Sequence, residues 1–129
     1  MSGLRVLYVD DEPDIREVAA MSLELDPEIE VKAVDCGAAA LEVFAGQDWR
    51  PDVVMLDVMM PNLDGPGTLA KLQEMPGFAG TPVVFITARA QVHEQKRLLG
   101  LGATGVITKP FEPMGLASEL RALLLKSAA

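Results

Sequence analysis

Residues 51–65 read PDVVMLDVMMPNLDG, and this stretch decides the fold because it holds a strand, a turn and a helix start in succession. Val53–Asp57 is apolar until its last residue, which is typical of a strand buried on both faces. A turn follows at residues 61–65, and Asp64 is placed to cap a helix that runs to about Glu74. A buried strand that leads into a helix predicts a parallel sheet covered by helices.

The same strand–helix unit recurs on both sides of this stretch. The other expected strands are Leu4–Val9, Glu30–Val34, Pro82–Ile86 with Thr87 at its end, and Gly105–Thr108; the other helices begin near Pro13, Gly37 and Gln91, and a last helix carries Leu116, Leu120, Leu123 and Leu124. The alternating second strand and the short fifth strand belong at the sheet edges. We therefore expect an α/β fold: a doubly wound, flavodoxin-like, five-stranded parallel sheet in the order 2-1-3-4-5, with five helices.

Two local features complete this expectation. Spacing near 3.6 residues places Ile15, Val18 and Leu25 on the inner face of the first helix. Cys36, the single cysteine, is expected to be a small packing residue near a turn, and it cannot close an internal disulfide.

Composition narrows the class of protein. The chain has 129 residues, enough for one domain over residues 1–129. Its 11 Lys and Arg against 19 Asp and Glu give a net charge of −8, which repels phosphate backbones and argues against direct nucleic-acid binding. No apolar run approaches the roughly 18 residues of a membrane span, so no membrane insertion and a cytoplasmic location are expected.

Polar side chains end the central strands of the expected sheet. Asp10 and Asp11 follow the first strand, Asp57 ends the third, Thr87 ends the fourth and Lys109 follows the fifth. Because parallel strands present their carboxyl ends at one edge, three carboxylates should share one pocket. Two such charges at about 4 Å repel by roughly 1 to 4 kcal/mol. A divalent cation would compensate, and hard oxygen ligands favour Mg²⁺.

These residue types suit phosphoryl transfer. Asp57 can act as the nucleophile at phosphorus, as carboxylates do when they form aspartyl phosphates. The metal would bridge Asp11, Asp57 and a phosphoryl oxygen, while Lys109 and the Thr87 hydroxyl would hold the remaining oxygens. The sequence therefore predicts a phosphoacceptor site at this sheet edge.

Five short stretches carry a resemblance to a known family: Asp10-Asp11, Asp57 within residues 53–61, residues 61–65, Thr87-Ala88 and Lys109-Pro110-Phe111. Through them the chain resembles the receiver domain of two-component response regulators over its whole length. The resemblance implies that Asp57 accepts a phosphoryl group from a sensor histidine kinase or a phosphotransfer protein. It implies that Asp11, Asp57 and the backbone carbonyl of Met59 hold Mg²⁺, with Asp10 in support, and that Lys109–Pro110 is a cis bond.

The resemblance also implies how the phosphorylated protein would pass a signal to a partner. The fourth helix, fifth strand and fifth helix are implied as the face read by a downstream protein partner, which is unknown. Val106 stands where many receivers carry an aromatic residue, so we expect the signal to pass through the loop and helix after Thr87. Met59 and Arg89, two residues beyond the acceptor and the threonine, suggest a long-lived phosphoryl state. The start at Met1 and the end after a full helix favour a free-standing protein over a fragment cut from a longer regulator or hybrid kinase. In either case a signalling receiver rather than an enzyme is expected.

Other functions stay open at this point. The first is a Mg²⁺-dependent phosphatase with an aspartate nucleophile, similar to the haloacid dehalogenase group, although Met59 occupies the place of the second acid that such chemistry needs. A flavodoxin-like electron carrier would need a phosphate loop where Asp10 and Asp11 stand. A silent docking receiver would not need the full reactive set. His93, the single histidine, is expected on the surface, and residues 100–105 are expected to form a turn rather than a dinucleotide site.

Overall fold

Strands and helices alternate from Leu4 to Ala128 in the computed structural model, which describes residues 3–46, 48–78, 80–89 and 91–128. The strands are β1 (Leu4–Val9), β2 (Ile29–Val34), β3 (Val53–Asp57), β4 (Val83–Thr87) and β5 (Gly105–Thr108). The helices are α1 (Pro13–Leu23), α2 (Gly37–Ala45), α3 (Gly65–Gln73), α4 (Val92–Gly100) and α5 (Leu116–Ala128). A short 3-10 helix, η1 (Pro113–Gly115), leads into α5 and was not predicted.

The strands form one parallel sheet in the predicted order, β2-β1-β3-β4-β5. In the register of the central strands, Val9 of β1 lies opposite Leu56 of β3, and Asp57 lies opposite Ile86 of β4. Since β3, β4 and β1 run in the same direction, their carboxyl ends meet at one edge of the sheet. This edge is where the chain turns from β1 to α1 and from β3 to α3.

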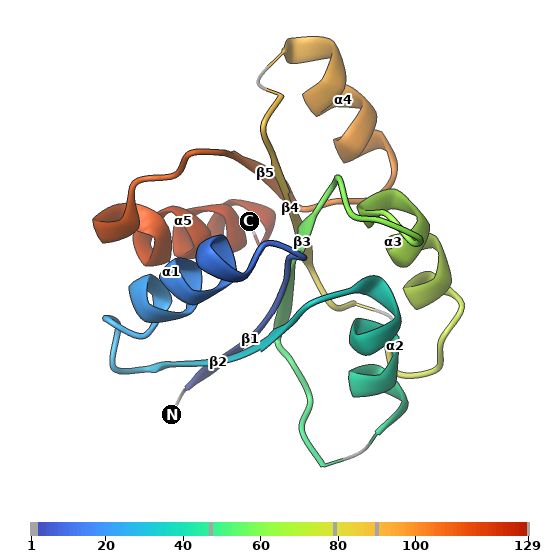
Figure 1. Ribbon diagram of the computed structural model, residues 1–129, viewed down its shortest axis with the longest axis horizontal. Coiled ribbons are helices and arrows are strands. Elements are labelled where there is room, and N and C mark those ends of the chain that lie inside the picture. Colours follow the sequence, from blue (N-terminus) through green and yellow to red (C-terminus); the bar gives the residue numbers. More distant parts are fainter. Residues whose placement is uncertain (1–2, 47, 79, 90, 129) are drawn as a thin grey trace.

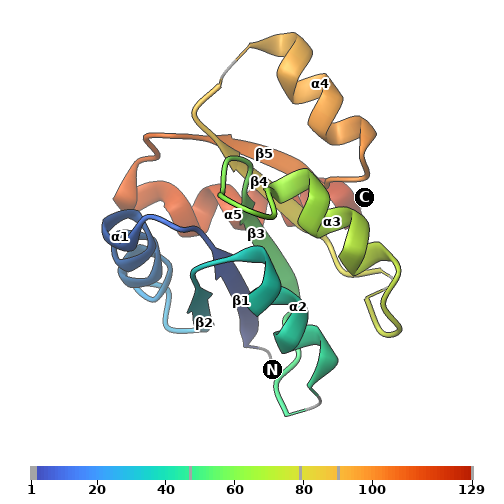
Figure 2. The same ribbon diagram turned by 45° about the vertical axis from the view of Figure 1, so that its right-hand side comes forward.

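Two apolar layers cover the two faces of the sheet (Figure 1, Figure 2). Helices α1 and α5 pack on one face, where Leu23 and Leu116 join Val6 and Ile107 in a buried cluster. Helices α2, α3 and α4 pack on the other face, in a separate cluster of buried side chains. The central strands β3 and β4 are buried along their whole length, as expected for strands covered on both faces.

The predicted inner face of α1 is wrong for Val18 and Leu25, while Ile15 is half-buried. The buried residues of α1 are Ala19, Ser22 and Leu23, whereas Val18 is 42% exposed. Leu25, which is 62% exposed, lies beyond the end of the helix, so helical spacing does not apply to it. Ala19 and Leu23 are the apolar residues of α1 that join the buried cluster on this face of the sheet.

Two smaller expectations have different outcomes. Cys36 is not simply a packing residue: it is the N-cap of α2, and its Sγ accepts a hydrogen bond from the backbone N–H of Ala39 at 3.4 Å. The turn at residues 100–105 is confirmed, since Gly102 has φ +111, a conformation that glycine adopts without strain. Among the described helices, none is long and apolar enough to cross a membrane.

Candidate functional site

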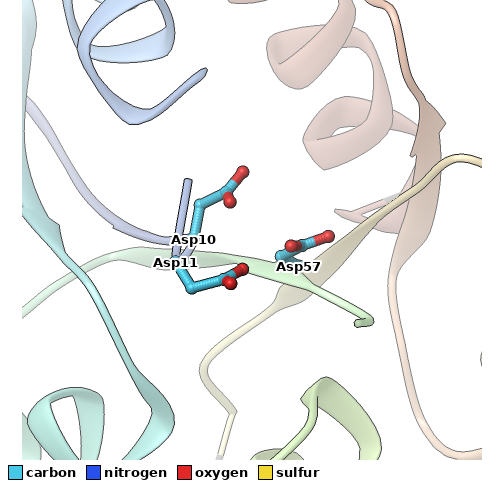
Figure 3. Close-up of side chains that lie close together, drawn as sticks. All are labelled: Asp10, Asp11 and Asp57. Atoms are coloured by element: carbon cyan, nitrogen blue, oxygen red, sulfur yellow. The ribbon is translucent and has the colours of Figure 1, made fainter. Parts of the chain in front are cut away.

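The predicted polar residues come together at the carboxyl edge of the sheet. Asp10 follows β1, Asp57 ends β3, Thr87 ends β4, and Lys109 follows β5. Figure 3 shows Asp10 and Asp11 on the turn after β1 close beside Asp57 on the end of β3. The winding of the sheet reverses between β1 and β3, which is where ligands bind in folds of this kind.

The three carboxylates form a cluster of oxygen donors. One oxygen of each can be chosen so that all three lie within 4.8 Å of one another. Asp10 is 0% exposed and Asp57 is 4% exposed, whereas Asp11 is more open to solvent. Carboxylate oxygens at this spacing, with one side open, are a donor set that fits a hard divalent cation. The chain's residues therefore fit a metal ion here.

Lys109 neutralises part of this charge. Its Nζ lies 3.2 Å from Asp10 Oδ2, from Asp57 Oδ1 and from Oε1 of Glu12. The Lys109–Pro110 bond is cis, as the resemblance implied. Although burial disfavours the charged ammonium, the neighbouring carboxylates of Asp57 and Asp10 hold the pKa of Lys109 above its ordinary value. Lys109 therefore stays protonated between Asp10, which follows β1, and Asp57, which ends β3.

Among the described carboxylates, Asp57 has the pKa that departs furthest from its ordinary value. Burial, followed by the charge of Asp10, raises the pKa of Asp57 from an ordinary 3.8 to about 6, against the opposing effect of Lys109. A raised pKa marks a carboxylate whose charge is poorly compensated by the protein alone. A cation or an incoming electrophile at Asp57 would relieve that repulsion.

Asp10 accepts hydrogen bonds from three residues that were not predicted to belong to the site. The buried hydroxyl of Tyr8 donates to Asp10 Oδ2 at 3.3 Å, and the backbone N–H of Glu12 donates to Oδ1 at 3.0 Å. Arg16 donates from Nη1 to the backbone carbonyl of Asp10 at 2.8 Å. Burial and then the charge of Asp10 raise the pKa of Tyr8 well above its ordinary value, so the phenol stays protonated and donates. One signal was available: Tyr8 is a polar residue in an aliphatic strand, on the same face as Asp10 two positions later.

Thr87 and Met59 line a common cavity near the ends of β3 and β4. Thr87 is 2% exposed, and its hydroxyl accepts a hydrogen bond from the backbone N–H of Arg89 at 3.0 Å. A cavity of about 330 Å³ beside Thr87 is lined in part by Met59 and Arg89. The Met59 side chain is 66% exposed and carries no group that binds water strongly. Val106 packs against the apolar cluster under α2, α3 and α4, and His93 is exposed on α4.

Comparison with known proteins relates this chain to response regulators. The family model described as "Response regulator receiver domain" matches residues 6–121. Curated relatives include a probable transcriptional regulator, ycf27, of Guillardia theta, 38% identical over 95% of this chain and 46% of its own length. The response regulator Rre1 of Synechocystis is 36% identical over 98% of this chain and 54% of its own length. The chain thus spans about half the length of the curated relatives it matches.

Solved structures agree with the sequence comparison. The chemotaxis response regulator CheY4 of Vibrio cholerae has a TM-score of 0.85 and 29% identity, covering 95% of this chain and 99% of that one. The receiver domain of the Francisella response regulator 1452 has a TM-score of 0.83 and 26% identity, covering 97% and 99%. These likenesses give no support to the alternative of a haloacid dehalogenase-type phosphatase.

Proposed function

Because the chain belongs to the family of response regulator receiver domains, which serve two-component signal transduction, we propose that Asp57 is its phosphoacceptor. The observation that carries the proposal is the position of Lys109 Nζ, 3.2 Å from both Asp10 and Asp57, which ties three strand ends into one site. A receiver is a signalling domain rather than a turnover enzyme. In this proposal it promotes its own phosphorylation and dephosphorylation.

The phosphoryl group comes from a phosphohistidine on a sensor histidine kinase or a phosphotransfer protein. An Asp57 carboxylate oxygen attacks phosphorus, a P–O bond forms and the P–N bond breaks. The departing imidazole keeps the bonding electron pair and takes a proton from solvent. Lys109 turns its ammonium from Asp57 to a phosphoryl oxygen, and the Thr87 hydroxyl donates to another.

The cation of this site is proposed to be Mg²⁺. Asp11, Asp57 and the backbone carbonyl of Met59 would hold it, with Asp10 in support, since hard oxygen donors favour this ion over zinc. Bound there, it would neutralise charge on the transferring phosphoryl group. Among the described residues, Asp10, Asp11 and Asp57 are the acids that gather closely enough to serve.

We expect the phosphoryl group on Asp57 to be long-lived. Hydrolysis requires a water aligned with the phosphorus atom, and a side chain that donates or accepts a hydrogen bond two residues past the acceptor could align it. The exposed thioether of Met59 offers only a weak acceptor. Loss of the phosphoryl group within seconds, followed by mass after donor removal, would contradict this expectation.

Phosphorylation is proposed to change the affinity of this chain for another protein. The added group brings roughly two negative charges, which Lys109 and Thr87 draw inward, so the loops after β3 and β4 shift between two arrangements. Residues 1–129 would act as one receiver domain, in the cytoplasm and without direct nucleic-acid contact. With Val106 in place of an aromatic residue, the signal would pass through the loop after Thr87 to α4, β5 and α5.

Intact-mass measurement tests the assignment. The protein is incubated with acetyl phosphate and Mg²⁺, and we expect a gain of one phosphoryl group. The Asp57→Asn variant and a sample treated with a chelator should gain none. Persistent labelling of Asp57→Asn would overturn the assignment of the acceptor, and undiminished labelling without metal would overturn the role of Mg²⁺.

A further inference from the structure

Tyr8 is an unusual residue for its place in the fold. It is the next-to-last residue of β1, opposite Ala33 of β2 and Met55 of β3, and it is 0% exposed. Its position in a parallel strand covered on both faces favours an aliphatic side chain. It is also the single tyrosine of the sequence. A phenylalanine would fill the same space without bringing a polar group into the core.

The hydroxyl of Tyr8 forms a hydrogen bond with the acid cluster. It donates to Asp10 Oδ2 at 3.3 Å, from the core side of the acid cluster. The phenol is neutral at physiological pH and the carboxylate can only accept, so the direction of this bond is fixed. A buried carboxylate is stable only where donors satisfy it, and Asp10 is fully buried.

The hydrogen-bond donors to Asp10 differ in whether they also contact other acids. Lys109 also lies 3.2 Å from Oδ2, but it is shared with Asp57 and Glu12. In the proposed reaction Lys109 turns toward the phosphoryl group. Tyr8, on the inner strand β1, and the backbone N–H of Glu12 are not shared with another acid in this way and stay on Asp10. Tyr8 then becomes the side-chain donor that keeps Oδ2 in place.

We infer that Tyr8 is a positioning residue of the metal site: its hydroxyl fixes the Asp10 carboxylate so that the cluster with Asp11 and Asp57 is ready to bind a divalent cation. This inference rests on the proposed function. Outer-shell partners of metal-binding carboxylates change metal affinity by about 10- to 100-fold when they are removed. The 3.3 Å contact is longer than the roughly 2.7 Å of a tight hydroxyl–oxygen bond, so we expect the lower end of that range.

The test compares Mg²⁺ binding by calorimetry in the wild type, Tyr8→Phe and Ser22→Ala. Ser22 is the matched control, because it is 6% exposed and its hydroxyl donates to the Val18 carbonyl at 2.7 Å on α1, away from the acid cluster. We expect Tyr8→Phe to bind Mg²⁺ about tenfold more weakly and Ser22→Ala to bind as the wild type does. Unfolding curves without metal check that both variants fold.

A spectroscopic measurement makes the test independent of Tyr8→Phe. In a Trp49→Phe background, Tyr8 is the single tyrosine and dominates the near-ultraviolet absorption. Addition of Mg²⁺ should shift that band with the same midpoint as the calorimetric titration, because the carboxylate bonded to the phenol belongs to the site.

The outcomes separate the inference from the proposed function. Equal Mg²⁺ affinity in Tyr8→Phe and wild type, or an unchanged tyrosine band while Mg²⁺ binds, would overturn the inference and leave the proposed function standing. Absence of Mg²⁺ binding in the wild type would overturn both.

Discussion

At the scale of single residues, the charge on Asp57 dominates the site. The side chain is 4% exposed and lies beside the buried carboxylate of Asp10, with Lys109 as the compensating cation. One positive charge among several carboxylates leaves a net repulsion, which is why burial and Asp10 raise the pKa of Asp57 to about 6. The poorly compensated charge of this cluster thus costs stability, as is common where residues are arranged for function.

This charge predicts a pH-dependent stability in the absence of metal. The pKa of Asp57 is about 6 in the folded protein and near 3.8 when unfolded, so the folded state binds the proton more tightly. Its stabilising contribution is complete below about pH 4 and is lost as the pH rises through about 6. At pH 8 and with a chelator present, Asp57→Asn should therefore have a free energy of unfolding about 2 to 3 kcal/mol above that of the wild type.

Denaturant unfolding at pH 3.5 and pH 8 measures this difference. The gap between Asp57→Asn and wild type should nearly vanish at the lower pH. Asp48→Asn, at an exposed acid far from the site, serves as the control and should show no gap that grows with pH. A constant gap for Asp57→Asn at both pH values would contradict the account of the buried charge.

At the scale of elements, the turn from β3 into α3 holds Asp57 in place. The backbone N–H of Gly65 donates to the Val58 carbonyl at 2.9 Å, and Asp64 caps α3 by accepting from the N–H of Gly67 at 2.8 Å. A Cβ at Gly65 would lie 2.5 Å from the Asp57 carbonyl oxygen. The helix start therefore approaches Asp57 as closely as a glycine allows.

Gly65→Ala should disturb both stability and reaction. The added methyl group must push the turn away from Asp57, so we expect a loss of about 1 to 3 kcal/mol in the free energy of unfolding and slower labelling by acetyl phosphate. Gly100→Ala is the control, since nothing lies within 4 Å of a Cβ there. Denaturant unfolding and intact mass check both variants. Wild-type labelling by Gly65→Ala would contradict the proposed role of this close approach.

The strands and helices also show which parts of the fold and the site could be predicted from the sequence. The strand ends that carry Asp57 and Lys109 were predictable, because buried apolar runs fix the strands and parallel pairing fixes where they end. The face of α1 was not, since several spacings near 3.6 residues fit its apolar residues and packing against the sheet selects one. The contact of Tyr8 with Asp10 had a local signal, since the two residues lie two positions apart on one face of the strand. The contact of Glu12 with Lys109 joins residues 97 positions apart, which no local pattern encodes.

At the scale of the whole molecule, the site joins two otherwise separate apolar layers. One buried cluster lies beneath α1 and α5, and the other beneath α2, α3 and α4. The acid cluster sits at the sheet edge between them, on loops that lead to helices of both layers. A ligand that ties β1 to β3 there should therefore stabilise the domain as a whole.

Mg²⁺ should raise the free energy of unfolding of the wild type, by about 2.7 kcal/mol when its concentration is 100 times the dissociation constant. Asp57→Asn should gain clearly less, because one carboxylate of the cluster is gone. Thermal or denaturant unfolding with MgCl₂, against NaCl of matched ionic strength, measures the effect. Equal gains in the two salts would show that the cation is not bound specifically.

The central claim is that one carboxylate, Asp57, carries the phosphoryl group. The most direct measurement is borohydride reduction after treatment with acetyl phosphate and Mg²⁺, followed by peptide mass mapping, because reduction of an aspartyl phosphate converts that residue to homoserine. The account predicts homoserine at position 57 and at no other acid. Homoserine at Asp10, Asp11 or another carboxylate, with position 57 unchanged, would contradict it.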